Sequence, residues 1–249
     1  MSSHLKFTYN MFKGNSFFSS IPPVTKNLII INFLLWLASF VILRRFDFDL
    51  NNYLGLHYIT SDNFNVAQFI TYMFMHDTSS IGHVFFNMFS VFIFGRTLEM
   101  VWGPKRFLFY YLTTGIGAGF IQELVWFLSV AGESAIPMID PITSAVIEIP
   151  VEYYTSWFNT VGASGAVFGI LLAFGMLFPN AQMFLMFIPI PIKAKYFVAF
   201  YGLIELFFGV ASVSGDNVAH FAHLGGMLFG LLLILYWRKK GIGGGGPFF

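Results

Sequence analysis

The sequence lacks cysteine and has little charge. It contains no Cys among its 249 residues, which excludes disulfide bonds, thiolate metal sites and a cysteine nucleophile. Only 10% of its residues are charged, whereas an average soluble domain has about 25%. That is too little polar surface for a soluble globule of this size. The net charge of +1 also gives no sign of the basic surface on which nucleic-acid binding depends.

Apolar residues are correspondingly abundant. They make up 57% of the chain, which contains 34 Phe and has a mean hydropathy of +0.72. This composition excludes a disordered chain and exceeds what one water-surrounded core buries. A helix that crosses a bilayer needs about 20 residues, so the length suits six spans with their loops. We therefore predict an all-α, multi-pass membrane protein built as a bundle of six transmembrane helices.

Charged residues and prolines divide the chain into six apolar segments. The predicted spans are residues 27–43, 80–101, 107–130, 161–178, 196–213 and 218–237. The membrane domain then covers residues 27–237, between a short N-terminal segment, 1–26, and a basic, Gly-rich tail, 238–249. Two longer polar stretches, 46–68 and 131–160, are expected to be loops at the membrane surface.

The distribution of basic residues predicts the orientation. Lys and Arg favour cytoplasmic loops. When both termini are cytoplasmic, only Arg44 and Arg45 of the 13 basic residues lie on the opposite side. We therefore expect both termini in the cytoplasm. No cleavable signal peptide or transit peptide is evident, and the short tails favour a bacterial inner membrane as the location.

Several polar side chains lie inside predicted spans, where they are costly and therefore candidates for function. His83 and Asn87 are four residues apart and share one face of the second span. Ser164 lies at the outer start of the fourth span, and His220 and His223 lie at the outer start of the sixth. All five belong to the extracytoplasmic halves of their spans, so they can meet at one depth.

Small residues allow the fourth and sixth spans to approach closely. Each carries two glycines four residues apart, a spacing that favours tight helix packing. These glycines are Gly165, Gly169, Gly226 and Gly230. Close packing brings Ser164 within hydrogen-bond reach of His223, which places a weak nucleophile beside a base. The Ser164 N–H and the side chains of Asn87 and His83 are then candidate donors to an oxyanion.

No carboxylate is evident as a third member of this group. Asp216 is seven residues before His223 and is expected in the preceding loop, so a Ser–His dyad is predicted. Taken singly, these residues also have simpler roles: a lone Ser at a helix start is most often a cap, and intramembrane histidines also serve as proton relays. A metal site formed by His83, His220 and His223 is disfavoured, because no HExxH motif is present and no acid has helical ligand spacing. We expect neither a metal nor a cofactor.

Taken together, the motifs resemble those of the rhomboid family of intramembrane serine proteases. The resemblance extends over about residues 68–237, in the family's order. The matching segments are His83-x-x-x-Asn87, Gly162-Ala163-Ser164-Gly165, Ala222-His223 with Gly226 and Gly230, and Gly95 to Gly103 with Glu99 at its centre. Each motif is modest alone, but four in order on the expected spans are highly specific.

The resemblance implies that Ser164 is the nucleophile and His223 the general base, with His83, Asn87 and the Ser164 N–H as the oxyanion hole. Supporting roles are implied for Gly162, Gly165, Gly226 and Gly230, and a structural one for His76. His220 does not match the family's catalytic position, and we expect it to pack against or support the site. The implied substrates are single-span proteins in the lipid bilayer, cleaved on the extracytoplasmic side. Residues 213–218 correspond to a cap over the site.

Two other functions are possible for such a sequence. An inactive rhomboid-like protein that binds membrane clients would keep the fold without the chemistry. A small transporter would use the histidines to relay protons, but the internal repeats common in transporters are not evident here. Labelling with a serine-directed probe separates the first alternative from a protease.

Overall fold

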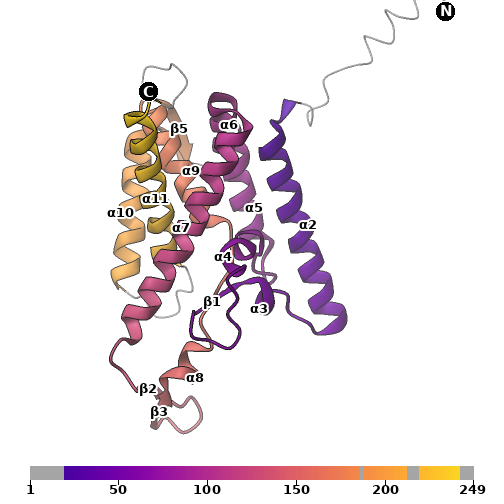
Figure 1. Cartoon of the computed structure of the whole chain (residues 1–249), viewed down its shortest axis with the longest axis vertical. Helices are drawn as coiled ribbons and strands as arrows, with labels where there is room; N and C mark the ends of the chain where they lie inside the picture. The colour runs from indigo at the N-terminus through magenta and orange to yellow at the C-terminus, as the bar shows by residue number, and fades with distance from the viewer. Residues whose placement is uncertain (1–19, 186–187, 212–218, 242–249) are drawn as a thin grey trace, which may run out of the picture.

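The computed structural model describes residues 20–185, 188–211 and 219–241, and these residues are mostly helical (Figure 1). Helices occupy all six predicted apolar segments. They are α2 (Pro23–Phe46), α5 (Ile81–Ser90) continued by the π turn η3 (Val91–Gly95) and α6 (Arg96–Trp102), α7 (Pro104–Val130), α9 (Ser164–Leu177), α10 (Ala194–Ala211) and α11 (His220–Lys239). The predicted helical class is therefore confirmed for the described residues.

Four of these helical segments are long and apolar enough to cross a membrane: α2, the continuous stretch 81–102, α10 and α11. Helix α9 has only 14 residues and is therefore about 21 Å long, shorter than the roughly 30 Å of a bilayer core. Helix α7 has 27 residues but is not among the four. The helices define a membrane protein, while the count of six spans stays a prediction.

The stretches expected as loops contain short elements. Between α2 and α5 lie α3 (Asn51–Leu54), β1 (Leu56–His57), α4 (Gln68–Thr71) and η2 (Tyr72–Phe74). Between α7 and α9 lie β2 (Ala135–Ile139), β3 (Val146–Pro150), α8 (Val151–Thr155) and β4 (Asn159–Thr160), and between α9 and α10 lie β5 (Gln182–Leu185) and β6 (Ile188–Lys193). Strand β1 pairs with β4 and so ties the two polar loops together.

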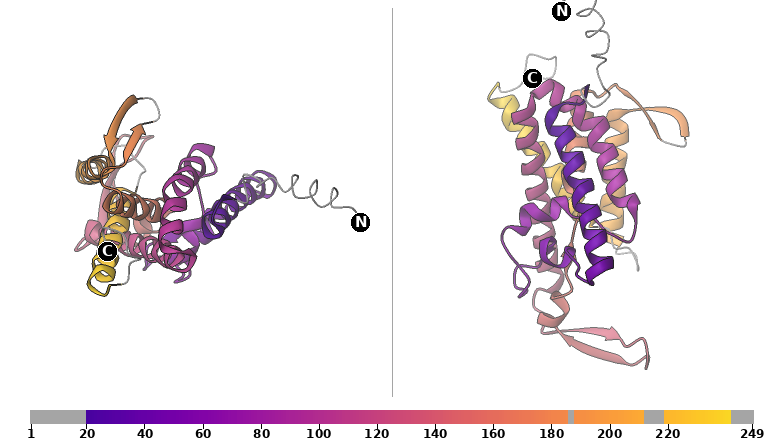
Figure 2. Two further views of the ribbon diagram at one scale, coloured as in Figure 1. Left: turned by 90° about the horizontal axis from the view of Figure 1, so that it is seen from above. Right: turned by 90° about the vertical axis from the view of Figure 1, so that its right-hand side faces the viewer.

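Two hairpins, β2–β3 and β5–β6, project from opposite ends of the bundle (Figure 2). The sequence did not predict them, since each strand is short. Branched apolar residues favour the strands of β2–β3, and Asp140 stabilises their turn by accepting hydrogen bonds from Ile142 N and Thr143 Oγ1. The start of α2 and the end of α11 lie at the same end of the bundle as β5 (Figure 1).

Helices α7, α9 and α11 pack together as the centre of the bundle. A Cβ atom added at Gly226 would overlap the backbone carbonyl of Gly165, so the predicted close approach of α9 and α11 is confirmed there. The other two glycines of the pairs face α7 instead. Gly169 packs against Thr114, and Gly230 packs against the Tyr110 hydroxyl, so α7 is held against both helices.

Glu99, at the centre of the glycine-flanked motif, joins α2 to the bundle. Its carboxylate accepts hydrogen bonds from the backbone N–H of Val24 at 2.9 Å and of Thr25 at 2.7 Å, and from the Thr25 hydroxyl at 2.8 Å. These are first-turn donors of α2, which have no acceptor within the helix, and a negative charge there also suits the helix dipole. Glu99 is 2% exposed, so its role is structural.

Candidate active site

Ser164 and His223 meet where α9 and α11 begin. Ser164 is the first residue of α9, and its Oγ lies 2.8 Å from His223 Nε2 in the first turn of α11. The close approach of Gly165 and Gly226 allows this short separation, because each glycine is close to one of the two side chains along its helix. The structure therefore brings together the two residues that the sequence pairs.

A carboxylate also reaches this pair, contrary to the expectation from the sequence. Glu205, on α10, places Oε2 2.8 Å from His223 Nδ1 and 2.7 Å from His220 Nδ1. The expectation that no carboxylate joins this group is therefore wrong, while Ser164 and His223 as the catalytic pair stay a prediction. Asp216, which the sequence analysis considered as a third member and placed in a loop, lies outside the described residues. The predicted cap, 213–218, lies outside them as well.

One signal in the sequence points to Glu205. It is the only charged residue in the predicted span 196–213, and an acid inside a span is a functional candidate by default. It was missed because it lies on a different helix from the histidines and has no fixed spacing to them.

Aromatic rings hold both imidazoles. The Phe168 ring stacks on His223 with centroids 4.2 Å apart and planes 8° apart. The Phe208 ring stacks on His220 with centroids 5.7 Å apart and an angle of 20°. With a ring on one face and Glu205 at the edge, each imidazole is restrained in tilt as well as in position.

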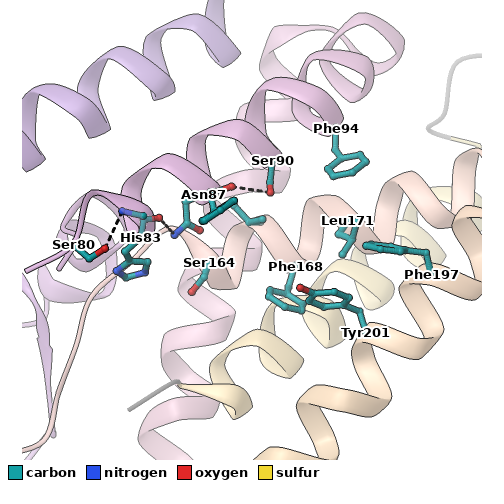
Figure 3. A pocket seen from close by; sticks show the side chains of 13 residues that line it. Ser80, His83, Asn87, Ser90, Phe94, Ser164, Phe168, Leu171, Phe197 and Tyr201 are labelled. Carbon is teal, nitrogen blue, oxygen red and sulfur yellow. Dashed lines mark hydrogen bonds between the residues drawn. The ribbon is translucent and has the colours of Figure 1, made fainter. Parts of the chain in front are cut away.

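His83 and Asn87 lie on α5, beside Ser164 (Figure 3). His83 Nδ1 accepts a hydrogen bond of 3.3 Å from the Asp77 N–H, which leaves the ring hydrogen on Nε2. That nitrogen faces Gly162, whose φ of 135° and lack of a side chain leave room for it. The Asn87 amide nitrogen donates to the His83 carbonyl at 2.9 Å. His83, Asn87 and Ser164 therefore line one cavity, and the roles of His83 and Asn87 as oxyanion donors stay a prediction.

His76 lies just before α5, and its ring centroid is 5.0 Å from that of His83. It is fully buried. Burial, and then the neighbouring His83, lower the pKa of His76 from its ordinary value of 6.5 to about 3. A neutral, packed ring agrees with the structural role that the resemblance implies.

A cavity of about 550 Å³ opens onto Ser164 between α5, α9 and α10 (Figure 3). Its lining is mostly apolar and aromatic, and Ser80, His83, Asn87 and Ser164 lie toward one end of it (Figure 3). The lining residues are Ser80, Gly82, His83, Phe86, Asn87, Ser90, Phe94, Ser164, Val167, Phe168, Leu171, Phe197 and Tyr201. The cavity therefore suits an apolar chain segment that presents one polar group to Ser164.

Glu205, His220 and His223 also carry atoms of the types that bind metals, and these atoms lie within 4.8 Å of one another. Their separations of 2.7 and 2.8 Å are those of hydrogen bonds. Two ligand atoms on one tetrahedral zinc ion lie about 3.3 Å apart, given bonds of about 2.0 Å. The group is therefore arranged as a hydrogen-bonded carboxylate with two imidazoles.

The fold and this site define a helical membrane protein in which a serine faces a histidine beside an apolar cavity. Residues 63–240 match the family model for the Rhomboid domain, more than half of the chain. The chain belongs to the rhomboid family.

Curated relatives support the same family. Rhomboid protein 1, mitochondrial, of Saccharomyces cerevisiae is 29% identical over 63% of this chain and 38% of its own length. RHOMBOID-like protein 12, mitochondrial, of Arabidopsis thaliana is 31% identical over 75% of this chain and 51% of its own length. Rhomboid-like protein 11, chloroplastic, of the same plant is 29% identical over 69% of this chain and 52% of its own length.

The chain thus spans about half or less of the length of these relatives. Their names assign them to mitochondria or chloroplasts. They therefore give no support to the bacterial inner membrane expected from the sequence.

Proposed function

We propose that this protein is an intramembrane serine endopeptidase that cleaves transmembrane or juxtamembrane segments of single-span membrane proteins. The observation that carries the proposal is the 2.8 Å separation between Ser164 Oγ and His223 Nε2, beside an apolar cavity between membrane helices. A hydroxyl next to a base is what nucleophilic acyl transfer requires. Membership of the rhomboid family supports the same reaction.

In this mechanism His223 Nε2 takes the hydroxyl proton while Ser164 Oγ attacks the scissile carbonyl carbon. The C–N bond breaks as His223 gives that proton to the leaving amine, which leaves an acyl ester on Ser164. A water molecule then attacks the ester with His223 again as base. The products are a carboxylic acid and an amine, and both residues return to their starting states.

Negative charge develops on the carbonyl oxygen during each attack. Ser164 is the first residue of α9, so its N–H has no acceptor within the helix and is free to donate. His83 presents its Nε2 hydrogen near Gly162, and the Asn87 amide lines the same cavity. We assign stabilisation of the oxyanion to these three donors.

The cavity also favours a particular kind of substrate. Its walls are apolar, as a segment from a bilayer would require, and its volume of about 550 Å³ holds several residues together with water, which occupies about 30 Å³ per molecule. A carbonyl in an intact helix is already hydrogen-bonded. The enzyme therefore selects segments whose helix unwinds at small or helix-breaking residues.

The decisive experiment incubates the purified protein with a panel of single-span substrates, beside Ser164→Ala and His223→Ala. Cleavage and labelling by a fluorophosphonate probe are expected from the wild type and from neither variant. Ser129→Ala is a matched control, because its hydroxyl bonds the Trp126 carbonyl on α7, outside the cavity. Wild-type cleavage by Ser164→Ala would refute the assigned nucleophile. Substrate binding without cleavage or labelling would instead favour the inactive, client-binding protein.

A further inference from the structure

We propose that Glu205 is a positioning residue of this site, which fixes the protonation and the orientation of the His223 ring. The inference rests on the proposed protease function and adds a carboxylate to it. Glu205 approaches from α10, while Ser164 and His223 come from α9 and α11. A third helix therefore contributes to the catalytic geometry.

Hydrogen-bond chemistry determines where the protons lie. An ionised carboxylate only accepts hydrogen bonds, so the 2.8 Å contact of Glu205 Oε2 with His223 Nδ1 requires a hydrogen on Nδ1. In the neutral ring the lone pair is then on Nε2, which faces Ser164 Oγ at 2.8 Å. This is the tautomer that a general base needs. When Nε2 takes the serine proton, the carboxylate lies beside the resulting positive charge.

The Glu205 carboxylate lies in a buried, mostly apolar environment, which is energetically unfavourable for a charged group without partners. The residue is 6% exposed, and most of its neighbours on α10 are apolar. Burying a carboxylate is unfavourable unless it is paired, and a well-packed apolar residue often serves stability equally well. The imidazoles of His220 and His223 compensate that cost by donating to the same oxygen, Oε2.

His220 holds the carboxylate from the adjacent turn of α11. His220 and His223 are three residues apart and so share one helix face, which lets a single carboxylate oxygen reach both. The 2.7 Å contact with His220 restrains Glu205 while His223 moves its proton. We assign His220 to holding Glu205, and it has no direct part in the chemistry.

The test is Glu205→Gln, which keeps the shape of the side chain. Its amide nitrogen is able to donate to His223 Nδ1, and this moves the ring hydrogen to Nε2, where it blocks acceptance of the serine proton. We expect the fluorophosphonate labelling rate and kcat to fall by about 10²–10⁴-fold, with KM and Tm close to wild type. Substrate affinity, measured in the Ser164→Ala background, should also stay unchanged.

Glu99→Gln is the matched control, because Glu99 is also a buried carboxylate but holds α2 and lies outside the cavity. It should lower Tm and leave kcat within about threefold of wild type. His220→Gln should lower kcat by less than about tenfold, since the contact between Glu205 and His223 remains.

A kcat for Glu205→Gln within about threefold of wild type would overturn the inference. So would a loss of kcat that merely follows a loss of Tm, as expected of a structural carboxylate. If the wild type cleaves and labels but Glu205→Gln does so equally well, only the role of Glu205 fails. If the wild type neither cleaves nor labels, the proposed function fails, and the role of Glu205 fails with it.

Discussion

Gly226→Ala is the most direct test of how helix packing sets the catalytic geometry. The added methyl group would overlap the Gly165 carbonyl oxygen and come within 3.2 Å of the Gly165 Cα atom. Carbon atoms in good contact are about 3.5–4.0 Å apart, and neither partner here is the end of a flexible side chain. Helices α9 and α11 must therefore separate by about 1 Å or more.

The separation acts on Ser164 and His223 because both lie within one turn of the contact. Their distance of 2.8 Å would lengthen past about 3.5 Å, where a hydrogen bond is lost. A misplacement of about 1 Å costs on the order of 10²-fold in rate. Overpacking of this kind also costs about 1–3 kcal/mol of stability. We therefore expect kcat to fall about a hundredfold in a protein that is folded but less stable.

The assay is cleavage of a single-span model substrate, with thermal unfolding measured on the same preparation. Gly202→Ala on α10 is the matched control, because its added methyl group would meet only the flexible end of Met227, at 3.2 Å. It should keep wild-type kcat. A Gly226→Ala protein with wild-type kcat would refute the conclusion that this contact allows the short distance between Ser164 and His223.

The remaining predictions concern the residues around the oxyanion and the buried histidine. Asn87→Ala should lower kcat by about 10²–10³-fold with little change in KM, measured by steady-state cleavage; an unchanged kcat would exclude Asn87 as a donor. Gly162→Ala should lower the labelling rate of Ser164, because its φ of 135° strains any side chain and the new Cβ would lie 2.9 Å from His83 Nε2; full labelling would contradict this. Stability should fall as pH drops from about 6.5 toward 3, because His76, with its pKa lowered to about 3 in the folded protein, takes up a proton mainly in the unfolded chain. Thermal unfolding at pH 7 and pH 5 measures this, and His76→Phe should reduce the difference.

Patterns within one helix could be predicted from the sequence, and contacts between helices mostly could not. His83 and Asn87 share a face because they are four residues apart, and the glycine pair on α11 indicates a close neighbour. Glu205 carries no such spacing, since its partners belong to another helix and only the packed structure brings them together. The hairpins β2–β3 and β5–β6 were missed for a related reason, because short strands are specified by pairing more than by local pattern.

The start of α9 could not be predicted from the sequence either. The apolar run 161–178 predicts a helix across its whole extent, but residues 161–163 are not helical and end in a bend. Gly162 N donates to the Tyr72 carbonyl at 2.9 Å, which holds this non-helical segment against the short helix η2. The helix then begins at Ser164 itself, and this leaves the Ser164 N–H available for an oxyanion.

Helix α10 contributes to the site in two ways. Its Phe197 and Tyr201 form one wall of the cavity, and its Glu205, one to two turns further along, holds the catalytic imidazole. A displacement of α10 would therefore change the cavity wall and the contact between Glu205 and His223 together. In the proposed protease, the shape of the substrate cavity and the orientation of the base would depend on the position of one helix.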